Sequence, residues 1–220
     1  MEILIKIYQY SGYLQIAIWL VLCYKSFQKH RFWNDYYRYF YYFLFIITFL
    51  ELANITTSVS KSFNNNNLFI GYFYTPCEFV LLGMFLQGVI KIRNFSLFVY
   101  ASSILFIIFD IYNAFWGQGY LNLNTNGDFI LNLYLIALSL WAYTALFKEV
   151  DGKKLFKRPS SWIVLSILLI YSTGILVNYL IGISYSILHY NFLYSVLITF
   201  NLLKSCYLLL YLKGISLIEK

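Results

Sequence analysis

Two short stretches decide the fold: Trp162–Ile170 reads WIVLSILLI, and Ser102–Phe109 reads SSILFIIF. In both, apolar residues occupy consecutive positions, whereas the strands of an outer-membrane barrel alternate apolar with polar residues. Backbone polar groups inside a bilayer have to be satisfied within the segment, so continuous apolar runs of this kind predict transmembrane helices. The fold class that we predict is an all-α membrane protein.

The composition of the whole chain agrees with this interpretation. Of its 220 residues, 61% are hydrophobic and only 11% are charged, and the mean hydropathy is +0.67. Soluble domains carry about 25% charged residues, so a water-soluble fold is excluded. The chain has two Pro and three Cys, which excludes collagenous and disulfide-framework proteins.

Seven transmembrane helices fit along the chain when each takes roughly 20 apolar residues. They form a single membrane domain over residues 1–220, with expected spans at 3–24, 39–59, 68–90, 95–115, 129–147, 162–181 and 190–211. No connection between them exceeds about 15 residues, which is too short for an extramembrane domain. We therefore predict a seven-transmembrane-helix bundle.

Basic residues give the orientation of this bundle, because short loops rich in Lys and Arg remain cytoplasmic. Thirteen of the 16 fall in one set of connections and in the C-terminal tail: Lys25, Lys29, Arg31, Arg38, Lys91, Arg93, Lys148, Lys153, Lys154, Lys157, Arg158, Lys213 and Lys220. We predict an external N-terminus and a cytoplasmic C-terminus. Connections 25–38, 91–94 and 148–160 are then inside, and 60–67 and 116–128 are outside.

The same features bear on location and partners. Frequent Ile, Lys, Asn, Tyr and Phe suit an AT-rich bacterial genome, which favours a bacterial cytoplasmic (inner) membrane. The net charge of +7 is spread over short segments beside aromatic residues, a pattern typical of anchoring to the lipid bilayer. Nucleic-acid binding is therefore excluded. The only histidines, His30 and His189, are far apart in sequence, so we predict no metal site and no cofactor.

Polar residues inside the spans carry the information about function, because burying them in a bilayer is costly. Glu51 and Asn54 share a helix face, as do Asp110 and Asn113, because each pair is three residues apart. We expect an acidic, amide-lined cavity that opens outward, with spans two, three, four and seven around it. Its candidate ligand- or proton-binding residues are Glu51, Asn54, Glu78, Asp110, Asn113, Asn132, Asn178, Asn191, Asn201 and Lys204. The alternative is that these side chains only join helices by hydrogen bonds.

Lys204 is the one cation expected within a span. Counting 1.5 Å per residue along each helix places it nearest in depth to Glu78, so we expect a contact between these two side chains, direct or through water. Alternatively, Lys204 extends to the cytoplasmic surface. Pro76, just before Glu78, removes a backbone donor from span three beside the cavity.

Three functions remain open from these residues. The preferred one is a receptor-like sensor or accessory module that binds a small-molecule or lipid ligand and acts through a separate cytoplasmic signalling partner. A proton-coupled transporter or channel of a small solute is the alternative, since proton relays use intramembrane acids. A carboxylate-based intramembrane lipid hydrolase is the third, although no motif specifies a catalytic residue and we do not expect an enzyme.

Glu51 at the end of an apolar run, the polar turn Asn64–Asn67 and Glu78 early in the third span together resemble uncharacterised small seven-span bacterial membrane proteins. The resemblance covers most of the chain. It implies the fold and no activity.

Overall fold

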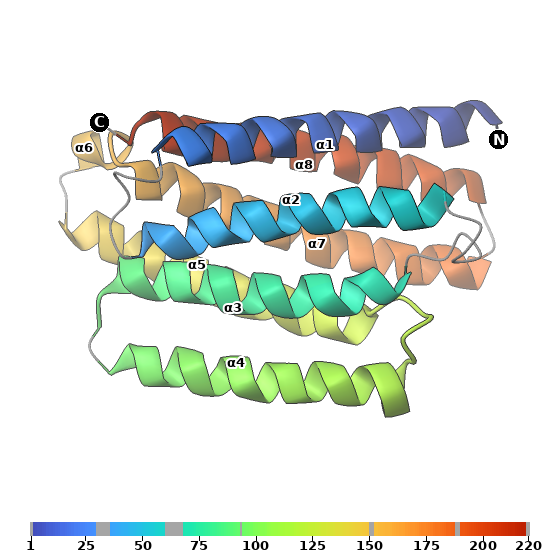
Figure 1. Cartoon of the computed structure of the whole chain (residues 1–220), viewed down its shortest axis with the longest axis horizontal. Helices are drawn as coiled ribbons and strands as arrows, with labels where there is room; N and C mark the ends of the chain where they lie inside the picture. Colours follow the sequence, from blue (N-terminus) through green and yellow to red (C-terminus); the bar gives the residue numbers. More distant parts are fainter. Residues whose placement is uncertain are drawn as a thin grey trace.

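In the residues it describes, the computed structural model has seven long helices that lie roughly parallel (Figure 1). These residues are 2–29, 36–59, 68–92, 94–149, 152–187 and 190–218. The long helices are α1 (Glu2–Lys29), α2 (Tyr37–Val59), α3 (Gly71–Ile90), α4 (Phe95–Tyr112), α5 (Thr125–Glu149), α7 (Pro159–Ile187) and α8 (Tyr190–Ser216). Three short turns adjoin them: the 3₁₀ turn η3 (Leu68–Ile70), the π-helical turn η4 (Asn113–Gly117) and α6 (Gly152–Leu155).

Six of the long helices have the length and composition to cross a bilayer, and each overlaps a predicted span. Among the described residues these segments are Tyr37–Thr57, Leu68–Ile90, Phe95–Gly117, Thr125–Glu149, Pro159–Leu180 and Asn191–Ser216. Helix α1 was predicted as the first span and is not among them; Lys6, Gln9 and Gln15 make it more polar. The structure therefore shows a multi-pass helical membrane bundle, while the seventh crossing stays a prediction.

Six helices close into a ring. Going around it, α1 packs on α2, α2 on α3, α3 on α5, α5 on α7, α7 on α8, and α8 returns to α1. Helix α4 lies outside this ring and packs mainly against α3, at the edge of the bundle in Figure 1. The expectation that span four borders the central pocket is therefore wrong. The apolar sequence of α4 predicts a helix. It does not predict which neighbouring helices α4 packs against, because that depends on residues of those helices.

Cations gather at one end of the bundle, where α1, α3, α5 and α8 finish and where α2, α4 and α7 begin (Figure 1). We call this the basic end. The basic residues whose side chains the structure describes there are Lys25, Lys29, Arg38, Lys91, Lys148, Lys154, Lys157, Arg158 and Lys213. The N-terminus of α1 lies at the opposite end. The predicted connection 60–67 and part of 25–38 lie outside the described residues.

Aromatic side chains fill the ring toward the basic end. Phe40 of α2, Phe85 of α3 and Tyr211 of α8 are completely buried. The ring centre of Phe40 lies 5.4 Å from that of Phe85 and 5.0 Å from that of Tyr211. Trp19 and Phe43 lie beside them, with their ring centres 5.8 Å apart. We call these five side chains the aromatic plug. Aromatic packing at these distances is favourable beyond the area buried, so the centre of the ring is closed on this side.

Candidate functional site

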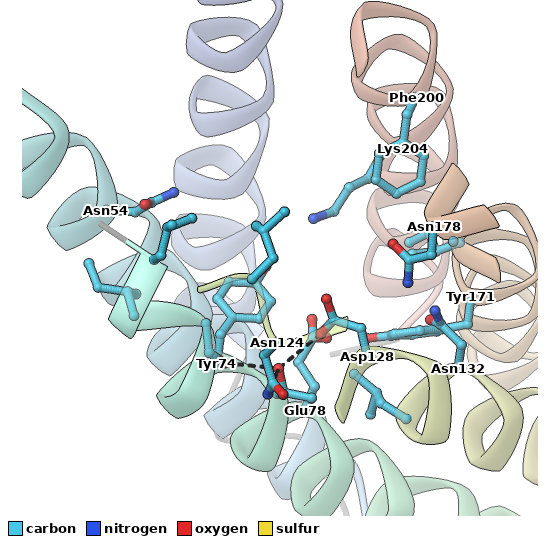
Figure 2. A pocket seen from close by; sticks show the side chains of 18 of the residues that line it. Asn54, Tyr74, Glu78, Asn124, Asp128, Asn132, Tyr171, Asn178, Phe200 and Lys204 are labelled. Carbon is cyan, nitrogen blue, oxygen red and sulfur yellow. Dashed lines mark hydrogen bonds between the residues drawn. The ribbon is translucent and has the colours of Figure 1, made fainter. Parts of the chain in front are cut away.

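A polar cavity of about 430 Å³ lies within the ring, on the other side of the aromatic plug. Figure 2 shows side chains that line it. All six helices of the ring contribute to its wall. The polar side chains that line it are Tyr8, Asn54, Tyr74, Thr75, Glu78, Asn124, Asp128, Asn132, Tyr171, Asn178 and Lys204. Two acids and one lysine thus face a space that is otherwise lined by amide, hydroxyl and apolar groups.

Lys204 projects from α8 into the cavity (Figure 2). Its Nζ lies 3.9 Å from Oε1 of Glu51, and the Tyr74 hydroxyl donates to the same oxygen at 3.1 Å. The Tyr74 ring also lies below the ammonium group, with its centre 5.7 Å away. Both charged side chains are only about 15% exposed, so this is a largely buried pair held by a tyrosine.

The expected direct partner of Lys204 is therefore wrong: among the described carboxylates, the one within ion-pairing distance is Glu51 and not Glu78. Depth along each helix placed Glu78 nearest, but depth says nothing of lateral position around the ring. The alternative, in which Lys204 extends to the cytoplasmic surface, is not the arrangement found either. Lys204 remains within electrostatic range of Glu78.

Glu78 and Asp128 enter the cavity from α3 and α5 (Figure 2). Glu78 is 7% exposed, and the hydroxyl of Tyr171 on α7 interacts with its carboxyl group. The two acids lie within electrostatic range of each other. In the described part of the chain, no Lys or Arg lies within 4.0 Å of either acid. The cavity thus contains two carboxyl groups without a direct cationic partner from the described residues.

A hydrogen-bonded chain holds Asp128 in place. The Thr75 hydroxyl donates to Oδ1 of Asp128 at 3.0 Å. Nδ2 of Asn124 donates to Oδ1 of Asp110 at 2.7 Å and lies 3.4 Å from the Thr75 hydroxyl oxygen. Side chains from α3, α4 and the start of α5 are therefore connected in one polar network, with Asp128 at its end in the cavity.

Asp110 and Asn113 are buried, as their shared helix face predicts, but they do not line the cavity. Asn113 donates through Nδ2 to Gln118 at 3.1 Å and to Asn124 at 2.9 Å. Gly127 allows Asp110 to come close, since a Cβ at this glycine would lie 2.7 Å from the Asp110 carboxylate. These two residues therefore join α4 to the ring. This is the alternative given above, in which polar residues within spans only connect helices by hydrogen bonds.

The remaining predicted residues divide between three places. Asn54, Asn132 and Asn178 line the cavity with Glu78 and Lys204. Asn201 lines an adjoining cavity and donates to the Ser11 hydroxyl at 3.0 Å. Asn191 is exposed and lines neither.

The adjoining cavity, of about 590 Å³, lies between α1, α2 and α8. Glu51 lines this second cavity, and Tyr8, Asn54 and Lys204 line both. The Lys204–Glu51 pair therefore stands at the boundary between the two spaces.

Sequence reasoning missed six polar residues of the central cavity: Tyr8, Tyr74, Thr75, Asn124, Asp128 and Tyr171. Asp128 was assigned to an external connection, but α5 already begins at Thr125. The spacing of Asp128 and Asn132, four residues apart, was the available signal, because it puts both on one helix face. With 23 tyrosines in the chain, no pattern distinguishes the three that reach the cavity.

The polar groups that line the cavity are amide, hydroxyl and carboxyl groups together with the ammonium group of Lys204. The described residues contain no group of three or more His, Cys, Asp or Glu side chains arranged to hold a metal ion. No family model, no curated protein and no solved structure matches this chain.

Proposed function

We propose that this chain is a receptor-like protein of the bacterial inner membrane that binds a small polar solute carrying a cationic group. The observation that carries the proposal is the charge imbalance in the cavity. Lys204 is paired with Glu51, which leaves Glu78 and Asp128 without a described cation at ion-pairing distance.

Buried carboxylates favour a cationic ligand for a physical reason. An unpaired charge away from water is costly, and it is offset by a counter-charge or by protonation. An ammonium group between Glu78 and Asp128 supplies that counter-charge. The asparagines and tyrosines around it offer both donors and acceptors to the rest of the solute, and a cavity of about 430 Å³ is of the size that small ligands use.

The orientation that fits this role has the cavity facing outward. The gathering of cations at the basic end supports a cytoplasmic location for that end. The start of α1 and the end of α8 lie at opposite ends of the bundle (Figure 1). This supports an odd number of crossings, with an external N-terminus and a cytoplasmic C-terminus. α1 is then the seventh crossing, and it packs against α2 and α8.

Signal output in this proposal passes to a separate cytoplasmic protein at the basic end. The described connections are short; α3 and α4, for example, are separated only by residues 91–94. A solute that draws α3 and α5 together through Glu78 and Asp128 would shift the other ends of the same helices, and small helix shifts of this kind are a common means of switching.

The binding experiment uses the purified full chain in lipid nanodiscs and its thermal unfolding. The solutes are primary amines, zwitterionic amino acids, neutral polyols and carboxylic acids of similar size. A ligand at about 100 times its Kd stabilises the folded state by about 2.7 kcal/mol, so a cationic solute should raise the Tm. Glu78→Gln and Asp128→Asn should each abolish the rise, while Glu149→Gln at the basic end should keep it. Equal shifts with carboxylic acids would contradict the proposal.

A proton-coupled transporter is the second candidate, favoured by the position of Lys204 between two cavities. If the Lys204 ammonium group moved from Glu51 to Glu78, the ion pair at the boundary would open and the two cavities would be connected. Uptake of the bound solute into proteoliposomes under a pH gradient separates the two functions. Binding without uptake supports the receptor, and accumulation that is lost in Lys204→Met supports the transporter.

A further inference from the structure

A groove between α1 and α8 lies at the basic end, remote from the polar cavity. We call it the α1–α8 groove. Its volume is about 530 Å³. The residues that line it are Lys25, Gln28, Lys29, Leu209, Leu212, Lys213, Ile215 and Ser216. It therefore combines three lysines with an apolar wall, and none of these lining residues is acidic.

The charges of this groove are concentrated by the helix geometry. Lys25 and Lys29 are four residues apart, so they share one face of α1, and Lys213 approaches from the last turn of α8. Like charges at this spacing disfavour one another. Lys29 also donates to the backbone carbonyl of Ile218, a neutral partner that leaves its charge in place.

Other cations at the same end are arranged differently. Lys91 and Arg158 both pair with Glu149, at 3.0 and 2.6 Å. That cluster has its own internal counter-charge. The α1–α8 groove, in contrast, presents positive charge to whatever enters it.

The apolar part of the groove continues onto the membrane-facing surface. Leu209 is 51% exposed, and it lies one turn along α8 from Lys213, toward the middle of the bundle. Basic side chains at the end of a span with exposed apolar side chains one turn deeper match the two halves of a phospholipid, whose phosphate lies at the interface above its acyl chains.

We propose that this groove binds one anionic phospholipid of the cytoplasmic leaflet, with the phosphate among Lys25, Lys29 and Lys213 and an acyl chain along Leu209 and Leu212. A membrane-surface lysine contributes about fivefold in affinity for anionic lipid. Loss of two lysines should therefore weaken binding by roughly 25-fold. This site is independent of the polar cavity and of the solute proposed for it.

The test titrates the detergent-solubilised full chain with phosphatidylglycerol or with phosphatidylcholine of the same acyl chains, and native mass spectrometry measures the fraction with one lipid bound. The unmodified chain should prefer phosphatidylglycerol. Lys25→Gln/Lys213→Gln should lose this preference by roughly 25-fold. Lys148→Gln/Lys154→Gln removes the same charge from the same end and should change it by less than about twofold.

Three results would overturn the proposal. Equal losses in both double variants would show a diffuse surface charge. Displacement of the lipid by soluble glycerol phosphate at the same concentration would show that the groove binds the phosphate alone and that its apolar wall does not contribute. Unchanged binding in Leu209→Trp, which blocks the apolar wall at an exposed position and spares the fold, would also exclude the acyl-chain contact.

Discussion

The Lys204–Glu51 pair makes a quantitative prediction about stability. At an effective dielectric constant of about 20, two unit charges 3.9 Å apart attract one another by about 4 kcal/mol. Much of this attraction is offset by the desolvation of both groups. The net coupling free energy between the two side chains should therefore be smaller, about 2 kcal/mol.

The two single substitutions should differ in cost. Lys204→Met removes the one described cation of the cavity and leaves Glu51, Glu78 and Asp128 together, so it should lower the free energy of unfolding by about 3–5 kcal/mol. Glu51→Gln leaves Lys204 within electrostatic range of Glu78 and Asp128. Its cost should be about 1–2 kcal/mol.

A double-mutant cycle in mixed micelles, with unfolding driven by added SDS, measures the coupling. The matched control is the cycle of Glu149→Gln with Arg158→Gln, an ion pair at 2.6 Å whose side chains are 35% and 40% exposed. Surface ion pairs have coupling free energies of about 0.2–1 kcal/mol. The control cycle should therefore give a smaller coupling free energy than the Lys204–Glu51 cycle, in spite of its shorter distance. A coupling of Lys204 to Glu78 that exceeds its coupling to Glu51 would refute the assigned partner, and purely additive effects would refute any pairing.

Three further predictions concern packing, the polar network and topology. A Cβ on Gly88 would clash with the Cβ of Tyr36, so Gly88→Ala should destabilise the bundle by about 1–3 kcal/mol and lower its Tm. Asn124→Ala leaves Asp110 without its 2.7 Å donor and should cost about 2–3 kcal/mol in the same unfolding assay, whereas Asn122→Ala, at an exposed position, should be nearly neutral. In a cysteine-free background, Asn122→Cys should react with an impermeant maleimide in intact cells and Lys154→Cys only after permeabilisation; the reverse pattern would invert the proposed orientation.

The sequence predicted the helices because each apolar run determines its own local structure. Trp162–Ile170 lies within α7 and Ser102–Phe109 within α4, since satisfying backbone groups within a segment needs no information about its neighbours. The arrangement around the ring is a property of pairs of helices. Helix α4 was expected beside the cavity, but its strongly apolar surface contacts mainly α3.

The candidate site was predicted in part for the same reason. Glu78, Asn132 and Lys204 were found because a polar residue inside an apolar run is conspicuous, and all three line the cavity. Asp128 was missed because it lies near the start of α5, where a carboxylate is also the ordinary residue near a helix N-terminus. The direct partner expected for Lys204 was wrong because the depth of two residues does not decide which side chains meet.

A seven-residue spacing connects the cavity with the plug that closes it. Residues seven apart on a helix lie on nearly the same face, about 10 Å along the axis. Five polar residues at the two cavities have a fully buried apolar or aromatic residue at this spacing toward the basic end: Glu78 has Phe85, Lys204 has Tyr211, Asp128 has Leu135, Glu51 has Leu44 and Tyr171 has Val164. These polar groups thus lie about two turns above a buried layer in which Phe85 and Tyr211 are aromatic and the other three residues are aliphatic. A transporter has to part that layer in every cycle, against ring contacts of 5.0–5.4 Å. A receptor needs only to shift it, and this is the physical reason to prefer binding over transport.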